Sequence, residues 1–323
     1  MKNIICIVGN PNCGKTTLFN ALTGSKQEVG NWPGVTVDKK TGRYSFEGSD
    51  VEIVDLPGIY SITPASTSGE DERIARDYIL TDEAQAVINI VDASNLERNL
   101  YLTAQLIEMR VPMVVAVNML DIAKNHKIEV DLKALQQALG CPVVGLVAAR
   151  EQGVRELQKT VAEILKNPQL PPMNVSFEDR IEKAREAITQ GLRKEGVERP
   201  EWFALQLVEG APGIEDKLPA EAYAKVKKIV DDVNAAYDGD ADIVVADARY
   251  NFVNRITQKA LIRHGEMSNT MTDKIDRVVL NRWLGLPIFL AIMYVMFLFT
   301  QNLGGAFIDF FDITFAGIFV DGF

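Results

Sequence analysis

A glycine-rich segment near the amino terminus has the residue types and the spacing of a phosphate-binding loop. The segment Gly9-Asn10-Pro11-Asn12-Cys13-Gly14-Lys15-Thr16 matches the pattern GxxxxGK(S/T), and it lies between a predicted strand at 4–9 and a predicted helix at 15–22. The backbone N–H groups of such a loop and the N-terminus of its helix bind a β-phosphate. We expect Lys15 to contact the β- and γ-phosphates and the Thr16 hydroxyl to bind Mg²⁺. The pattern alone fits both ATP and GTP.

Two later motifs each follow a predicted strand. Asp55-Leu56-Pro57-Gly58 ends the strand at 51–55, where the Asp55 carboxylate can hold Mg²⁺ through water and Gly58 can offer its N–H to a γ-phosphate. Asn118-Met119-Leu120-Asp121 ends the strand at 112–118, and Asp121 can accept two hydrogen bonds from guanine that adenine cannot supply. Each motif alone is a common turn. Together, at the strand ends where open α/β sheets bind ligands, the three motifs indicate a GTPase.

The first 166 residues alternate between strand and helix patterns. We predict strands at 4–9, 43–46, 51–55, 86–92, 112–118 and 142–147, and helices at 15–22, 96–109, 132–139 and 153–165. Continuous apolar strands between helices predict an α/β fold with a mostly parallel sheet covered on both faces. A turn at Gly48-Ser49-Asp50 joins two of these strands and predicts one antiparallel edge.

After a proline-rich linker at 167–173, strand patterns nearly vanish. Helical spacing at 177–194, 202–208, 219–237 and 240–264 predicts a small all-α bundle. The predicted domains are therefore 1–166, the α/β domain; 174–266, the helical domain; 267–282, a juxtamembrane segment; and 283–323, the start of a membrane region.

The last of these regions is defined by its apolar composition. Residues 283–308 carry no charge, and 284–299 are almost continuously apolar, which meets the ~20-residue length of a membrane helix. Lys274, Arg277 and Arg282 precede it, so the positive-inside rule places residues 1–282 in the cytoplasm. A second apolar stretch at 307–320 runs to the end of the sequence, as expected of a longer protein cut within its membrane domain.

Charge and cysteine content exclude other classes of protein. The 34 basic and 44 acidic residues give a net charge of -10, which disfavours nucleic acid as a partner. Cys6, Cys13 and Cys141 are too few for a disulfide framework and fit a reducing compartment.

The motifs give the chain a family resemblance. Residues 1–166 resemble a Ras-like GTPase domain, and nearly the whole chain resembles the N-terminal region of FeoB-type ferrous iron transporters. The segments that carry this likeness are 9–20, 30–37, 55–60, 118–121, 246–250 and 304–309. The resemblance implies a cytoplasmic GTPase domain, a helical domain similar to a nucleotide-dissociation inhibitor, and a Fe(II) permease in a bacterial inner membrane. It also implies contact with membrane lipid, a small cytoplasmic regulatory partner and a homo-oligomer.

The resemblance also implies roles for individual residues. Thr36 becomes the first-switch threonine, which completes the Mg²⁺ shell when GTP is bound. The residues implied to contact nucleotide beside those above are Thr17, Gly34, Val35, Met119, Ala148 and Ala149. Ala149 would meet guanine O6 through its N–H, although the loop Ala148-Ala149-Arg150 lacks the serine that relatives often carry there.

The resemblance leaves the source of positive charge for hydrolysis open. Ile59 stands where many GTPases place a water-orienting glutamine, and the first-switch segment shows no arginine finger. Asn12 could instead hold K⁺, together with the backbone carbonyls of Gly30 and Trp32, as in potassium-activated relatives. The alternative is that Asn12 only forms hydrogen bonds within its loop.

Three rival functions remain open from the sequence. A soluble GTPase of ribosome assembly or tRNA modification would usually carry a basic domain, which the net charge opposes. A P-loop ATPase motor is opposed by Asn118 and Asp121. A nucleotide sensor that binds GTP without turnover would differ only in phosphate release.

Overall fold

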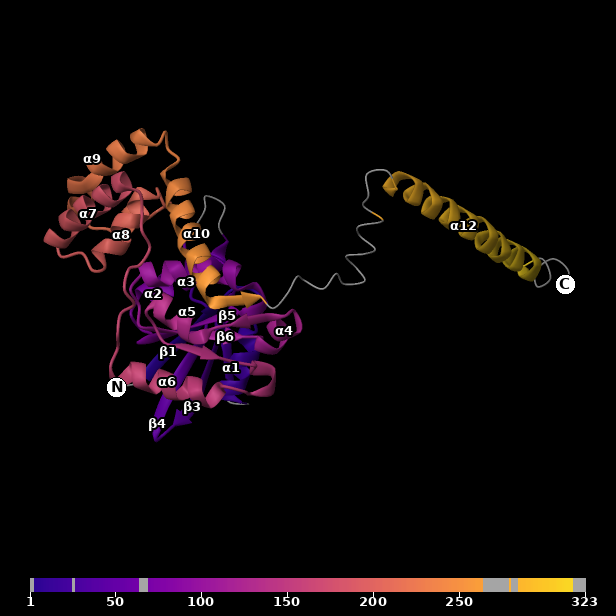
Figure 1. The fold of residues 1–323 in the computed structure, drawn as a ribbon, viewed down its shortest axis with the longest axis horizontal. Coiled ribbons are helices and arrows are strands. Elements are labelled where there is room, and N and C mark those ends of the chain that lie inside the picture. Colours follow the sequence, from indigo (N-terminus) through magenta and orange to yellow (C-terminus); the bar gives the residue numbers. More distant parts are fainter. Residues whose placement is uncertain (1–2, 25–26, 64–68, 264–278, 280–283, 316–323) are drawn as a thin grey trace. The chain divides into compact units, whose positions relative to one another are not determined.

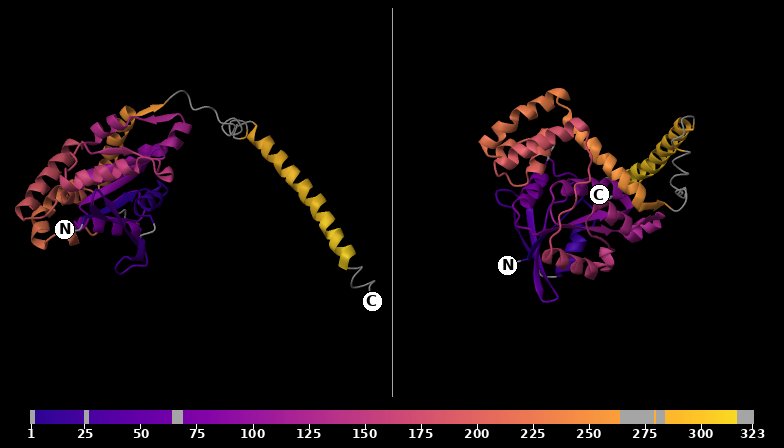
Figure 2. Two further views of the ribbon diagram at one scale, coloured as in Figure 1. Left: turned by 90° about the horizontal axis from the view of Figure 1, so that it is seen from below. Right: turned by 60° about the vertical axis from the view of Figure 1, so that its left-hand side comes forward.

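The computed structural model describes residues 3–24, 27–63, 69–263, 279 and 284–315, and the chain divides into two units, Met1–His264 and Gly265–Phe323. The first unit contains a seven-stranded sheet with helices on both faces, followed by a cluster of helices (Figures 1 and 2). The second contains one long helix. The predicted α/β class and the helical part that follows it are confirmed.

The sheet has the order β2-β3-β4-β1-β5-β6-β8. Its strands are β1 (Asn3–Gly9), β2 (Gln27–Asn31), β3 (Asp38–Phe46), β4 (Ser49–Asp55), β5 (Ala86–Asp92), β6 (Met113–Asn118) and β8 (Val143–Gly145). The pairs β4–β1, β1–β5, β5–β6 and β6–β8 are parallel. The pairs β2–β3 and β3–β4 are antiparallel. The predicted antiparallel edge is confirmed, but it has three strands because β2 adds a further hairpin.

Alternating side chains of the buried strands enter two separate cores. Ile5 and Ile7 of β1 face α1 (Lys15–Thr23) and α6 (Val154–Lys166), whereas Cys6 and Val8 face the opposite core. The opposite core contains α2 (Glu70–Leu80), α3 (Leu96–Glu108) and α5 (Leu132–Leu139). This alternation explains why the strands are apolar throughout, since both faces are covered.

The helical part shares the second of these cores. It comprises α7 (Asp179–Lys194), α8 (Pro200–Val208), α9 (Ala220–Ala236) and α10 (Ala241–Ala260). Its Trp202, Val226 and Phe252 belong to the same buried cluster as α3, and α10 packs along α3 and α5 (Figure 1). The α/β and helical parts therefore form one compact unit.

The structure corrects three predicted elements. The predicted helix at 240–264 ends at Ala260, because Leu261–Arg263 form strand β9, which pairs with β7 (Ile128–Val130), a strand that the sequence analysis missed. Asp131 N–H donates to Ala260 O at 2.8 Å and fixes this crossing.

The hairpin turn lies at Glu47-Gly48, both with positive φ as two-residue hairpins require, so Ser49 already belongs to β4. Strand β3 begins at Asp38, five residues before the predicted start.

The second unit consists of α12 (Gly285–Phe315). Its stretch Gly285–Asn302 has a mean hydropathy of 1.5 and contains no buried residue, and it is long and apolar enough to cross a membrane. The structure has one continuous helix where two apolar stretches were predicted, up to Phe315. The remainder of the second stretch, 316–320, and the predicted juxtamembrane segment at 267–282, except Val279, lie outside the described residues.

Candidate nucleotide-binding site

The phosphate-binding loop joins β1 to α1 in a conformation that only small or flexible residues adopt. Gly14, directly before α1, has φ +90°, and Asn12 has φ 65°. A Cβ at Gly14 would lie 2.2 Å from Asn118 Nδ2, and a Cβ at Gly9 would lie 2.5 Å from Ile90 O. Side chains at these two positions would push the loop off the sheet, which explains the glycines.

The two charged groups of the site are in direct contact. Lys15 Nζ lies 2.6 Å from Asp55 Oδ1, and Asp55 is buried at the end of β4, opposite Ile7 of β1. Thr16 is the second residue of α1, directly after Lys15, and is exposed. A hydroxyl and a carboxylate are hard oxygen ligands of the kind Mg²⁺ prefers, so the residues present fit this ion.

The segment after Asp55 is held against the phosphate-binding loop. Leu56 N–H donates to Ile7 O at 3.0 Å, and Ile59 N–H donates to Gly9 O at 3.2 Å. A Cβ at Gly58 would be 3.3 Å from Pro11 Cα, so the two loops touch. Ile59 is fully buried in the core, hence its side chain faces away from the loop surface where water would attack.

Asn118 connects three segments at the far end of the site. Its Nδ2 donates to Cys13 O at 3.0 Å, and its Oδ1 accepts from Ala148 N–H at 2.9 Å. Both polar atoms of the Asn118 side chain are therefore engaged, and they join the phosphate-binding loop to the Ala148-Ala149 loop. Asp121 remains half-exposed, with Arg150 3.7 Å away as its ion partner. No motif in the sequence pointed to Arg150 as a partner of Asp121.

The predicted K⁺ ligands occupy different elements. Gly30 lies in β2, and Trp32 is packed edge-on against Tyr78 of α2, with Lys39 Nζ 4.9 Å from the Trp32 ring. The Trp32 carbonyl accepts from Val35 N–H at 3.2 Å. Among the described residues, no contact joins Asn12 to Gly30 or Trp32. Gly34 has φ +79°, and Thr36 is exposed.

Cys13 is a structural residue of the loop. It is 1% exposed, and burial raises the pKa of its thiol to about 11, against the lowering effect of Lys15. A neutral, buried thiol is a poor nucleophile, which fits the role of a small packing side chain.

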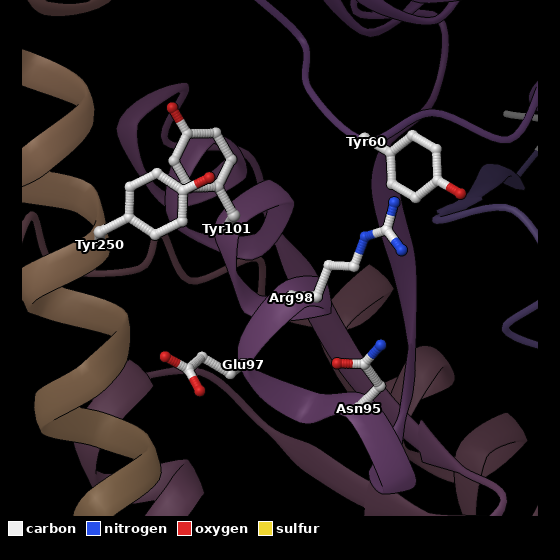
Figure 3. Close-up of a pocket in the computed structure, with 6 residues that line it drawn as sticks. All are labelled: Tyr60, Asn95, Glu97, Arg98, Tyr101 and Tyr250. Carbon is white, nitrogen blue, oxygen red and sulfur yellow. The ribbon is translucent and has the colours of Figure 1, made fainter. Parts of the chain in front are cut away.

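A hollow on the α3 side of the loop was not predicted. A cavity of about 200 Å³ touches Pro11, Asn12, Asn95 and Arg98, and Tyr60, Asn95 and Arg98 also line a neighbouring hollow of about 510 Å³. In Figure 3 the Arg98 guanidinium lies against the Tyr60 ring, 4.3 Å from its centroid. Tyr60 ends the segment 55–60 that carries the family likeness but was given no role, and Arg98 belongs to no motif.

The order of the sheet, the phosphate-binding loop after β1, and the motifs after β4 and β6 define a Ras-like GTPase domain. Comparison with known proteins identifies the family. Residues 3–161 match the family described as ferrous iron transport protein B, and residues 177–262 match the FeoB cytosolic helical domain. The chain belongs to the FeoB family.

Similar proteins extend the comparison beyond the matched domains. The Fe(2+) transporters FeoB of Legionella pneumophila (strain Lens) and Escherichia coli (strain K12) are each 41% identical over 98% and 99% of this chain. The chain spans 41% of the length of either relative.

Solved structures show the same fold. The cytosolic domain of L. pneumophila FeoB has 37% identity and a TM-score of 0.72, covering 80% of this chain and 99% of its own. A GDP-bound S. thermophilus FeoB G domain has 36% identity and a TM-score of 0.73, covering 81% and 100%. The T. maritima FeoB cytosolic domain in its GMPPNP form has 33% identity and a TM-score of 0.70, covering 81% and 100%.

Proposed function

We propose that this chain binds GTP and hydrolyses it to GDP and phosphate by attack of water, as the nucleotide-dependent part of a Fe(II) transporter. The observation that carries the proposal is the convergence of three motifs on one sheet edge. Lys15 touches Asp55, Gly58 touches Pro11, and Asn118 binds Cys13. Relatives with this fold were solved with GDP and GMPPNP.

Most of the predicted residues receive a role in this proposal. The backbone N–H groups of residues 9–17, except Pro11, which has none, bind phosphates. Lys15 exchanges its contact with Asp55 for one with the β- and γ-phosphates. Asp121 accepts from guanine, and Ala149 donates its N–H to guanine O6, since Ala148 is already bound to Asn118. Gly58 donates its N–H to the γ-phosphate.

Thr16, Thr36 and Asp55 are the proposed Mg²⁺ ligands. Bound there, the ion would neutralise charge on the phosphate oxygens. Asn12 is exposed on the loop and lines the hollow next to Pro11, so its amide oxygen is free to bind K⁺. Such an ion would supply the positive charge that Ile59 and the first-switch segment lack. The carbonyls of Gly30 and Trp32 would join Asn12 only after the 30–36 segment closes over the nucleotide.

The transport role rests on the family and on α12. The named relatives are Fe(2+) transporters, and the apolar stretch Gly285–Asn302 suits a membrane. We place residues 1–282 in the cytoplasm of a bacterium and α12 in its inner membrane, in contact with lipid. A small regulatory partner and self-assembly are further parts of this proposal.

Multiple-turnover phosphate release tests the proposed activity. The protein with Mg²⁺ should release more than one phosphate per chain from GTP and almost none from ATP. A single stoichiometric burst would indicate a nucleotide sensor, and equal release from ATP would indicate an ATPase. Either result would overturn the assignment.

A further inference from the structure

Helix α3 holds the segment that follows Gly58. Gln105, on α3, accepts from Ile62 N–H at 2.8 Å through Oε1. Its Nε2 donates to Ser61 Oγ at 2.9 Å and to Thr63 Oγ1 at 3.1 Å. One amide thus binds three consecutive residues, and they begin three residues after Gly58.

The environment makes these contacts strong. Gln105 is 2% exposed, so water does not replace a bond that is lost. Arg98 lies two helical turns earlier on α3 and stacks on Tyr60, the residue before Ser61. The same face of α3 therefore contacts each residue from Tyr60 to Thr63.

The helical part reaches the same segment. Gln206 of α8 donates through Nε2 to Thr63 Oγ1 at 3.4 Å and to Glu209 Oε2 at 2.8 Å. Gln206 is 1% exposed. Thr63 is therefore shared between an amide of the GTPase domain and an amide of the helical part.

A buried ionic triad fixes the distance between these two amides. Arg249 of α10 binds Glu108 of α3 at 2.8 Å and Glu209 at 2.9 Å, and all three side chains are almost fully buried. Gln105 and Glu108 are one turn apart on α3, and Gln206 and Glu209 are one turn apart near the end of α8. The triad therefore locks α3, α8 and α10 beside Thr63.

Closer to the phosphate-binding loop the two parts are less tightly joined. Figure 3 shows Tyr60 and Arg98 on one side of the 510 Å³ hollow and the stacked pair Tyr101 and Tyr250 on the other. The rings of this pair are 4.8 Å apart. Tyr60 therefore has space beside it, whereas residues 61–63 are held by Gln105.

We propose that Gln105 is a positioning residue for GTP hydrolysis, and that the helical part acts on the same step through Gln206 and Thr63. The inference rests on the proposed GTPase function. Gln105 holds the Ile62 N–H and the hydroxyls of Ser61 and Thr63, and so sets where the Gly58 N–H meets the γ-phosphate. Small displacements of such a group reduce the rate of the chemical step more than binding. GDP lacks the γ-phosphate and is bound independently of this contact.

The test compares two buried polar residues of the same helix. Gln105→Met keeps the side-chain volume and removes all three hydrogen bonds. The matched control is Thr103→Val, which removes a buried 2.6 Å hydrogen bond to Asn89 Oδ1 but touches none of residues 60–63. Gln206→Met removes the contact from the helical part. Thr63→Val removes the hydroxyl that Gln105 and Gln206 share. It takes the place of Gln105→Met in the test if that variant fails to fold.

The readouts are kcat and KM for GTP, GDP affinity and melting temperature. We expect Gln105→Met to lower kcat about tenfold or more while GDP affinity changes less than about twofold. Gln206→Met and Thr63→Val should shift kcat in the same direction, and Thr103→Val should change only the melting temperature. If an active wild type shows the same kcat loss in Gln105→Met and Thr103→Val, the inference is wrong. A wild type without GTP turnover would overturn the proposed function itself.

Discussion

At the scale of the single residue, Asp121 is the proposed determinant of the choice of base. We expect Asp121→Asn to move preference from guanine toward xanthine, since an amide presents a donor where the carboxylate accepted. Loss of the paired, charge-assisted contact should weaken GTP binding by about 2–5 kcal/mol. Competition between GTP, XTP and ATP for the same site measures the change.

Arg150 provides the control for this substitution. It pairs with Asp121 at 3.7 Å but is mostly exposed. Arg150→Ala should therefore weaken GTP binding by less than about 1 kcal/mol and leave base preference unchanged. Equal binding of ATP and GTP by the unmodified chain would show that Asp121 does not read the base.

The proposed potassium dependence rests on Asn12. We expect GTP hydrolysis to be faster in KCl than in NaCl at equal ionic strength, because Na⁺ is too small for the same set of oxygens. An arginine finger is worth about 10³–10⁵ in rate, which bounds the effect that a fixed cation could supply. Asn12→Ala should abolish the difference and leave GDP affinity nearly unchanged. Steady-state phosphate release decides between these outcomes.

The backbone at Asn12 calls for a second variant. Its φ of 65° suits asparagine and glycine better than alanine, so Asn12→Ala also introduces strain. Asn12→Gly removes the amide without that strain. A loss of the K⁺ effect in both variants assigns it to the amide, and equal rates of the wild type in both salts would rule it out.

At the scale of elements, the triad of Arg249 with Glu108 and Glu209 holds α10 to α3 and α8. Burial raises the pKa of Glu108, and Arg249 opposes that rise. Burial disfavours the Arg249 cation too, but the two carboxylates outweigh it and hold the pKa of the guanidinium well above its ordinary value. Arg249→Met would leave two buried carboxylates without their guanidinium partner. It should lower the free energy of unfolding by about 3–5 kcal/mol near neutral pH.

The sign of the pH dependence follows from Glu108. Without Arg249 its folded-state pKa lies still further above the unfolded value, so the protonated form is favoured by folding. The stability of the variant should be greatest below the unfolded pKa of about 4.3 and should fall as pH rises through the folded pKa. Denaturant unfolding at pH 5 and pH 8 should show a larger difference in free energy of unfolding between the variant and the wild type at pH 8. A gap that is the same at both pH values would contradict this account.

At the scale of the whole molecule, the chain combines a compact nucleotide-binding unit with an exposed apolar helix. A chain that lacks residues from 281 onward should remain folded and bind GTP, because both buried cores of Met1–His264 are built without α12. The longer chain should partition with membranes or detergent, because Gly285–Asn302 is apolar and exposed. Size-exclusion chromatography with and without detergent compares the two, and a monodisperse 1–323 in plain buffer would contradict the membrane span.

The separation into parts was only partly visible in the sequence. The helical spacing after the linker at 167–173 predicted the helices, but not that Trp202 and Phe252 would continue the core of the sheet. The residues of strand β9 fall within the predicted helix at 240–264, because no glycine or proline separates Leu261 and Ile262 from α10. Its conformation depends on pairing with β7, more than 130 residues earlier, which no local pattern records.

The sequence by itself determined the elements whose cause is local. The spacing of Gly9, Gly14 and Lys15, the apolar run of each central strand and the apolar composition of α12 are set by neighbouring residues. The tertiary structure alone decided which distant groups meet. Asn118 joins Cys13 to Ala148, Gln105 and Gln206 share Thr63, and Arg249 binds a carboxylate 141 residues away. The physical reason is that a buried polar group must find a partner, but folding chooses that partner from any part of the chain.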